Sequence, residues 1–124
     1  MNKEQYVSFE IAKLLKEKGF NWSTHNYYDE IGRIWFEDIL GDWNHRTTPE
    51  VSCPTQQMAL DWLKEKGMYI SVVHDFNEYG EYPDDLYWFA RVYDLKNGDY
   101  IHSTKLYVGS QEAFEAALEY VLNI

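Results

Sequence analysis

The segment from Cys53 to Phe76 constrains the fold of this chain more than any other, because it encodes a complete helix followed by a strand. Pro54 disfavours a helix before it, and the hydroxyl of Thr55 can cap the first free N–H groups of the helix. Gly67 supplies the left-handed residue with which helices commonly end. The apolar residues between these two signals recur at the spacing of one helix face: Met58, Ala59, Trp62 and Leu63.

After Gly67 the apolar period changes from that of a helix to that of a strand. Alternate residues of 68–76 point to opposite sides, and the side that carries Ile70 and Val72 is mainly apolar. A helix with one apolar stripe that leads directly into such a strand predicts that the two elements pack against each other.

Three stretches carry a resemblance that covers most of the chain: Cys53-Pro54-Thr55 with Ala59, Trp62, Leu63, Lys64 and Glu65, the opening residues 9–20, and the closing residues 112–118. On these stretches the chain resembles a group of small bacterial and prophage-type proteins of uncharacterised function. The shared residues shape helices and a strand, and the resemblance implies no activity. No functional residue is therefore carried over from it.

The other elements follow from the same two periods. Helices are predicted over residues 3–18 and from Ser110 onward, each with a single apolar stripe. The stripe of the last helix is Phe114, Ala117, Leu118, Val121 and Leu122. Strands are predicted over residues 20–28, 33–40, 86–94 and 100–108. Asn97 and Gly98, between the last two strands, are a strong signal for a tight hairpin turn.

The predicted order is helix, two strands, helix, three strands, helix. Connections of hairpin length make the sheet largely antiparallel, and one-sided helices cover a single face of such a sheet. We therefore expect one α+β domain over residues 1–124, built in two layers. Its five-stranded sheet would carry all three helices on one face.

The composition excludes several classes of function. The net charge is −10, so phosphate backbones repel the chain and direct nucleic-acid binding is disfavoured. The chain lacks the basic patch that attracts anionic membranes, and no segment is apolar enough to span one. A single cysteine rules out an internal disulfide. The opening residues lack the apolar centre of a signal peptide, which favours a cytoplasmic protein.

Residues 41–54 form the longest stretch without any period, and loops of this length in compact domains are often functional. This loop is the first candidate site, with Trp43, His45, Arg46 and Cys53 as its pocket residues. Cys53 lies just before a helix N-terminus, and a nucleophilic thiol with His45 as its base can be considered there. No third residue is spaced to complete a triad, so a packing role for Cys53 is favoured.

The second candidate site is the sheet face that faces away from the helices. It is unusually aromatic for a face that water would cover. Its members are Tyr69, Tyr87, Phe89, Arg91 and Tyr93. Tyrosine, tryptophan and arginine are the residues that most often anchor protein interfaces.

Metal and cofactor motifs are absent from the sequence. The four histidines share no ligand spacing, and His74 alternates with strand residues that point to the core. The run that begins at Asp75 resembles a calcium loop, but Leu86 stands where a bidentate glutamate is required. We expect no metal and no cofactor.

Two hypotheses about function remain. The favoured one is a small non-enzymatic protein-interaction module that uses the aromatic sheet face to bind a protein partner or a second copy of itself. An accessory protein of a mobile genetic element and an acidic inhibitor of a nucleic-acid-binding protein are two forms of it. The alternative is a small-molecule-binding protein or minor enzyme with a pocket near the 41–54 loop.

Overall fold

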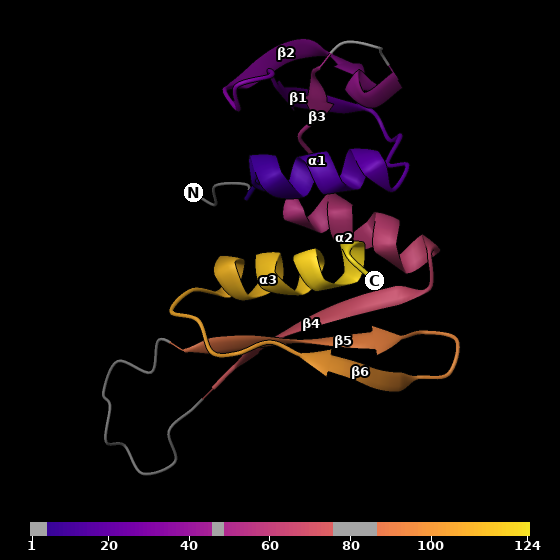
Figure 1. Ribbon diagram of the computed structural model, residues 1–124, viewed down its shortest axis with the longest axis vertical. Coiled ribbons are helices and arrows are strands. Elements are labelled where there is room, and N and C mark those ends of the chain that lie inside the picture. Colours follow the sequence, from indigo (N-terminus) through magenta and orange to yellow (C-terminus); the bar gives the residue numbers. More distant parts are fainter. Residues whose placement is uncertain (1–4, 46–48, 76–86) are drawn as a thin grey trace. The chain divides into compact units, whose positions relative to one another are not determined.

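The structure, a computed structural model, describes residues 5–45, 49–75 and 87–124. Within these ranges the fold is α+β, with three α-helices, one short 3-10 helix and two antiparallel sheets of three strands each. The chain divides into two compact units, Met1–Trp62 and Leu63–Leu122, and the division falls inside the second α-helix. Each unit contains one of the two sheets (Figure 1).

The first unit begins with helix α1, Phe9–Glu17. Ser8 is its N-cap, and the Ser8 hydroxyl accepts a hydrogen bond of 3.3 Å from the backbone N–H of Ile11. The helix is followed by Gly19 with a φ of 92°, a conformation that glycine adopts at little cost. The buried side of α1 consists of Ile11, Ala12 and Leu15.

The sheet of the first unit has the order β2-β1-β3. Strand β1, Thr24–Tyr28, lies in the middle, while β2, Ile34–Gly41, and β3, Val51–Ser52, form the two edges. Helix α1 packs against β3. The 3-10 helix η1, Trp43–His45, lies between β2 and β3 in the chain.

The largest side chains in the core of the first unit are aromatic. Phe20 is almost completely buried, and its ring centroid lies 5.6 Å from that of Trp62 with the rings nearly perpendicular. Trp43 is also buried, and its indole N–H donates a hydrogen bond of 2.8 Å to the carbonyl oxygen of Thr24. This bond satisfies the polar edge of an otherwise apolar side chain.

Helix α2, Gln56–Glu65, begins and ends at the predicted signals. The hydroxyl of Thr55 accepts a hydrogen bond of 3.1 Å from the backbone N–H of Met58, which confirms the cap. Gly67 has a φ of 86°, the left-handed conformation expected after the helix end. Trp62 and Leu63 are buried, as the apolar stripe predicts.

The second unit contains strands β4, Met68–His74, β5, Trp88–Asp94, and β6, Asp99–Ser103, in the order β4-β5-β6. Helix α3, Ser110–Leu122, packs against β4 and β5. Figure 1 shows α3 running across one face of this sheet. The β5–β6 turn contains Gly98 with a φ of 72°, so the predicted Asn-Gly hairpin is confirmed.

Strand alternation sets the interior of the second unit. The residues of β4 and β5 that lie toward α3 include Ile70, Ala90 and Val92, which are buried. His102 of β6 lies opposite Val92, and its ring stacks on Tyr120 of α3 with centroids 3.7 Å apart. The predicted stripe of α3 is buried throughout: Phe114, Ala117, Leu118, Val121 and Leu122.

The expectation of one five-stranded sheet with three helices on one face is wrong. The described strands form two separate three-stranded sheets, and α1 packs in the first unit whereas α3 packs in the second. The reason lies in Val51–Ser52, a two-residue strand inside the segment expected to lack structure. It pairs with β1 and completes a sheet within the first unit.

Several element boundaries also differ from the prediction. The first helix begins at Phe9 rather than at residue 3, because Ser8 caps it. The first strand begins at Thr24 because Phe20 lies in the core before the strand starts. The last strand ends at Ser103, although Tyr107 returns to form an isolated bridge with Trp88.

Candidate functional site

Strand register places most of the predicted aromatic residues on one face of the second sheet. Tyr69 lies opposite Tyr93, and Phe89 lies opposite Val73. Arg91 lies opposite Ser71 in the same face. The aromatic residues Tyr69, Phe89 and Tyr93 are half-buried, and Arg91 is exposed. This surface, called the aromatic face below, points away from the residues that α3 covers.

Tyr87 lies at the end of this face, one residue before β5. Its carbonyl oxygen accepts a hydrogen bond of 2.9 Å from the backbone N–H of Asp75, so the pairing of β4 and β5 continues to this point. The side chain of Tyr87 is exposed. Tyr87 therefore extends the aromatic face at its rim.

Strand β6 adds two residues to the aromatic face that the sequence analysis did not include. Tyr100 lies opposite Tyr93, and Ser103 lies opposite Arg91. The register between β5 and β6 shifts between these two pairs, so simple alternation along β6 assigns only one of them to this face. The Asn-Gly turn already implied that residues close to it on β5 and β6 face each other, and Tyr100 could have been found from that signal.

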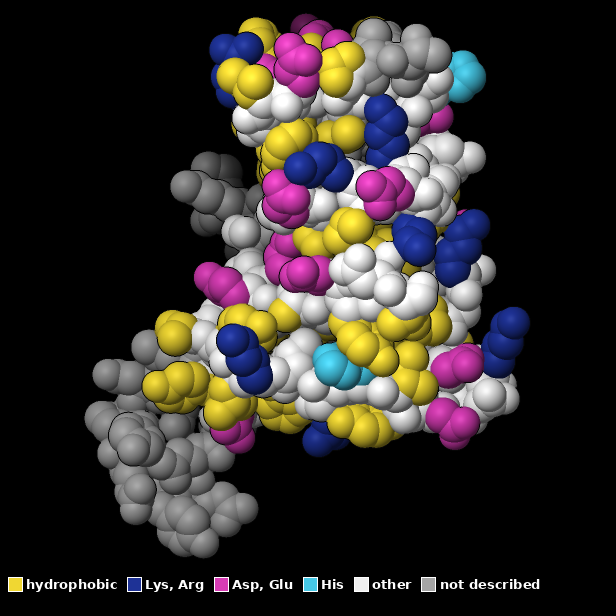
Figure 2. Space-filling model, viewed as in Figure 1, with side chains coloured by type: hydrophobic (Ala, Val, Ile, Leu, Met, Phe, Trp, Pro, Cys, Tyr) yellow, Lys and Arg dark blue, Asp and Glu magenta, His cyan; other side chains and the backbone are white. Residues whose placement is uncertain are grey.

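Four of these residues line a shallow hollow of about 420 Å³: Arg91, Tyr93, Tyr100 and Ser103. The rings of Tyr93 and Tyr100 meet edge to face with centroids 6.2 Å apart, and Tyr100 is 55% exposed. The hollow thus combines two aromatic bodies, a serine hydroxyl and a guanidinium group. Figure 2 shows hydrophobic side chains reaching the surface along this sheet.

The guanidinium group of Arg91 is the positively charged group among the four residues that line the hollow. Its central carbon lies 5.1 Å from the centroid of the Phe89 ring, which is a cation–π contact. No carboxylate of the residues that the structure describes lies within ion-pair distance of it. A guanidinium group has five N–H donors in a planar fork, and that fork fits a carboxylate with two parallel hydrogen bonds.

The 41–54 loop places its predicted pocket residues differently. Trp43 is in the core, where its ring centroid lies 4.6 Å from that of Tyr27. Cys53 is 1% exposed, and its Sγ lies 3.8 Å from the carbonyl oxygen of Val7. His45 is exposed at the end of η1. Arg46 lies outside the described residues.

A second surface that the sequence analysis missed is strand β2. Its apolar side chains are exposed although the strand is part of a sheet. The exposed ones are Ile34, Trp35, Phe36, Ile39 and Leu40. The hairpin was expected to lie in a larger sheet beneath helices, so its exposure could not be read from its apolar period.

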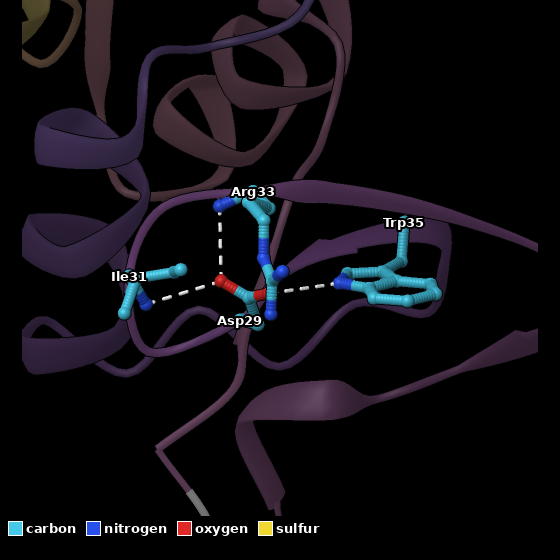
Figure 3. Close-up of polar contacts among 4 residues, drawn as sticks. All are labelled: Asp29, Ile31, Arg33 and Trp35. Carbon is cyan, nitrogen blue, oxygen red and sulfur yellow. Dashed lines mark hydrogen bonds and ion pairs between the residues drawn. The ribbon is translucent and has the colours of Figure 1, made fainter.

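The turn before β2 is organised by the carboxylate of Asp29. The carboxylate accepts hydrogen bonds from the backbone N–H groups of Ile31 and Arg33, from Arg33 Nε at 2.7 Å, and from Trp35 Nε1 at 3.0 Å (Figure 3). The indole hydrogen bond, together with those from Arg33 and Ile31, holds the pKa of Asp29 far below its usual range. Asp29 is therefore a fixed anion that orients Arg33 and Trp35.

No group of three or more metal-binding side chains occurs among residues 5–45, 49–75 and 87–124. The run that resembles a calcium loop lies outside these ranges beyond Asp75. None of the described helices has the length and apolar character needed to cross a membrane.

Comparisons with protein-family models, with curated proteins and with solved structures found no significant match to this chain.

Proposed function

We propose that this chain is a small non-enzymatic interaction module that binds a partner protein through the aromatic face. The observation that supports the proposal is the hollow lined by Arg91, Ser103 and the two tyrosines Tyr93 and Tyr100. Tyrosine and arginine side chains on a rigid sheet are common anchors of protein interfaces. Tyrosine also suits a surface that is wet in the free protein and dry in the complex.

The chemistry of the hollow defines the kind of partner. Arg91 has a cation–π contact with Phe89 but no carboxylate partner among the described residues, so a carboxylate of the bound protein can take that place. The tyrosine rings on one side would pack against an apolar or aromatic neighbour of that carboxylate. The partner we propose therefore presents an acidic residue next to an apolar one.

The overall charge argues against a nucleic acid at this surface. A chain with a net charge of −10 is repelled by phosphate backbones, and one exposed arginine does not make a basic patch. Self-association through the same face is the alternative form of the proposal, because the chain itself carries 21 acidic residues. An accessory role in a mobile genetic element and inhibition of a nucleic-acid-binding protein both remain forms of this function.

The other hypothesis, a pocket near the 41–54 loop, gains no support from the described part of that loop. Trp43 and Cys53 are core residues and do not present their side chains to a ligand. His45 alone of the three described residues is exposed.

The test compares wild type with an Arg91→Glu, Tyr100→Ala variant in quantitative affinity capture from the native host. Lys96→Glu serves as the control for Arg91→Glu, because Lys96 is an exposed cation of the same hairpin that lies outside the hollow. We expect a specific partner that is retained by wild type and by Lys96→Glu and lost by the double variant. Recovery of the same proteins by all three would refute the proposal, provided circular dichroism shows that all three are folded.

Sedimentation of the same three proteins separates a foreign partner from a second copy. Self-association that disappears only in the double variant would assign the aromatic face to a homodimer. Self-association that the double variant retains would have to use another surface.

A further inference from the structure

Strand β2 is an edge strand with little of the protection that edge strands usually have. It is eight residues long, it contains neither lysine nor proline, and its side chains from Ile34 to Leu40 are all exposed. Natural proteins normally shorten such an edge, charge it with lysine or cover it, because an open edge pairs with other chains. Glu37 and Asp38 are the only charged residues within it.

The first half of β2 is the regular part. Ile34, Trp35 and Phe36 pair in sequence with Tyr28, Tyr27 and Asn26 of β1. Beyond Phe36 the register shifts, because the step from Asn26 to Thr24 on β1 is matched by the five-residue step from Phe36 to Gly41 on β2. A straight template for another strand therefore exists only over the segment from Arg33 to Glu37.

Backbone hydrogen bonding shows which groups of this segment point outward. The N–H of Asp29 donates to the carbonyl of Arg33 at 2.9 Å, so Arg33 and, two residues on, Trp35 direct their backbone groups toward β1. Ile34 and Phe36, which alternate with these two residues along the strand, direct their N–H and C=O groups to the open edge. These outward groups can form a ladder with an added strand.

We propose that β2 pairs with β2 of a second copy of this chain, antiparallel and about a two-fold axis at Trp35. In this register the outward backbone groups of Ile34 meet those of Phe36 of the second copy, and both side chains are apolar. Trp35 stands beside Trp35 of the second copy in the closer, non-hydrogen-bonded type of pair. Arg33 stands opposite Glu37 of the second copy, so each end of the pairing joins opposite charges.

Registers with the axis further along the strand are worse by the same criteria. An axis at Phe36 would place Trp35 opposite Glu37 and Ile34 opposite Asp38, so that each apolar side chain meets a carboxylate. An axis at Glu37 would place two glutamates against each other, which destabilises a cross-strand pair. The self-complementary sequence of residues 33–37 thus favours a second copy over an unrelated strand.

The Asp29 carboxylate prepares this edge for pairing. It holds Arg33 by Nε and Trp35 by Nε1, so two of the pairing side chains are ordered before association (Figure 3). Arg33 is 67% exposed, and its two terminal nitrogens remain available to Glu37 of the second copy. Fixing side chains in advance lowers the entropy that association must overcome.

The dimer is tested first by sedimentation velocity at physiological salt, over concentrations from low to high micromolar. We expect a dimer for wild type and a dimerisation constant weakened roughly tenfold or more in Glu37→Arg, since both ends of the pairing then join like charges. The control is Glu30→Arg, an exposed glutamate outside the pairing segment. It makes the same change of net charge, so it should leave association unchanged or slightly stronger.

A cysteine experiment tests the register itself in a Cys53→Ala background. In the proposed pairing Trp35→Cys brings two thiols together at a non-hydrogen-bonded pair, where Cα atoms about 4.5 Å apart suit a disulfide. Oxidised glutathione should therefore cross-link Trp35→Cys but not Ile39→Cys, whose site is even more exposed but lies off the axis.

Three results would overturn the inference: a monomeric wild type at high micromolar concentration, a dimer that Glu37→Arg does not weaken, or equal cross-linking of the two cysteine variants. If Glu37→Arg does not weaken the dimer but the Arg91→Glu, Tyr100→Ala variant loses it, the aromatic face is the dimer interface instead. A dimer that depends on β2 does not test partner binding by the aromatic face, which the affinity-capture experiment tests separately.

Discussion

Replacing Trp62 with alanine tests whether the apolar stripe of α2 is a structural element of the core. Trp62 is 4% exposed, and its ring lies 5.6 Å from the ring of Phe20, itself among the most completely buried side chains. The substitution removes an indole from a site that the surrounding residues cannot fill without moving. We therefore expect the variant to be folded but markedly less stable.

The magnitude follows from the burial. A tryptophan buries up to about 250 Å², and at about 25 cal/mol per Å² its burial is worth up to roughly 6 kcal/mol. Alanine retains part of that area, and the edge-to-face contact with Phe20 adds about 0.5–1.5 kcal/mol to what is lost. A loss of about 3–5 kcal/mol in the free energy of unfolding is the expected result, in line with large aromatic truncations elsewhere.

Urea denaturation followed by far-ultraviolet circular dichroism measures this loss. Ile39→Ala is the matched control, because Ile39 is a large apolar residue that is 66% exposed. It should change the free energy of unfolding by less than about 0.5 kcal/mol. A Trp62→Ala midpoint close to that of wild type and of Ile39→Ala would refute the burial of this helix face.

Two further predictions follow from buried and hydrogen-bonded groups. Cys53 is 1% exposed, so a thiol reagent at neutral pH should label it more slowly than a free thiol by a factor on the order of 10³ or more. Labelling faster than that of a free thiol would instead support the hypothesis that Cys53 is a nucleophile. The pKa of Asp29 is lower in the folded state than in the unfolded chain, so its contribution to stability is complete above about pH 4 and is lost as the pH falls toward the folded value. Denaturation midpoints measured between pH 6 and pH 2 should therefore fall less steeply for Asp29→Asn than for wild type, and parallel curves would contradict the role of that carboxylate.

Local signals in the sequence were sufficient to identify the helices and most strands. The cap at Thr55 and the glycines at positions 19, 67 and 98 act through their nearest neighbours in the chain, and each is found in the predicted role. The stripe of α3 is equally local, because a period of 3.6 residues defines a face whatever that face packs against. Alternation along residues 88–94 likewise separated the buried residues Ala90 and Val92 from Phe89 and Arg91.

The sequence by itself therefore determined the approximate positions of the three helices and of every described strand except Val51–Ser52, and which side of each helix is apolar. Only the tertiary structure decided which strands pair, because pairing depends on contacts between residues far apart in the chain, and periodicity carries no information about partners. The pairing of Val51–Ser52 with β1 divided the expected sheet in two and left β2 as an open edge. The same long-range contacts buried Trp43 and Cys53 and brought Tyr100 and Ser103 beside Arg91.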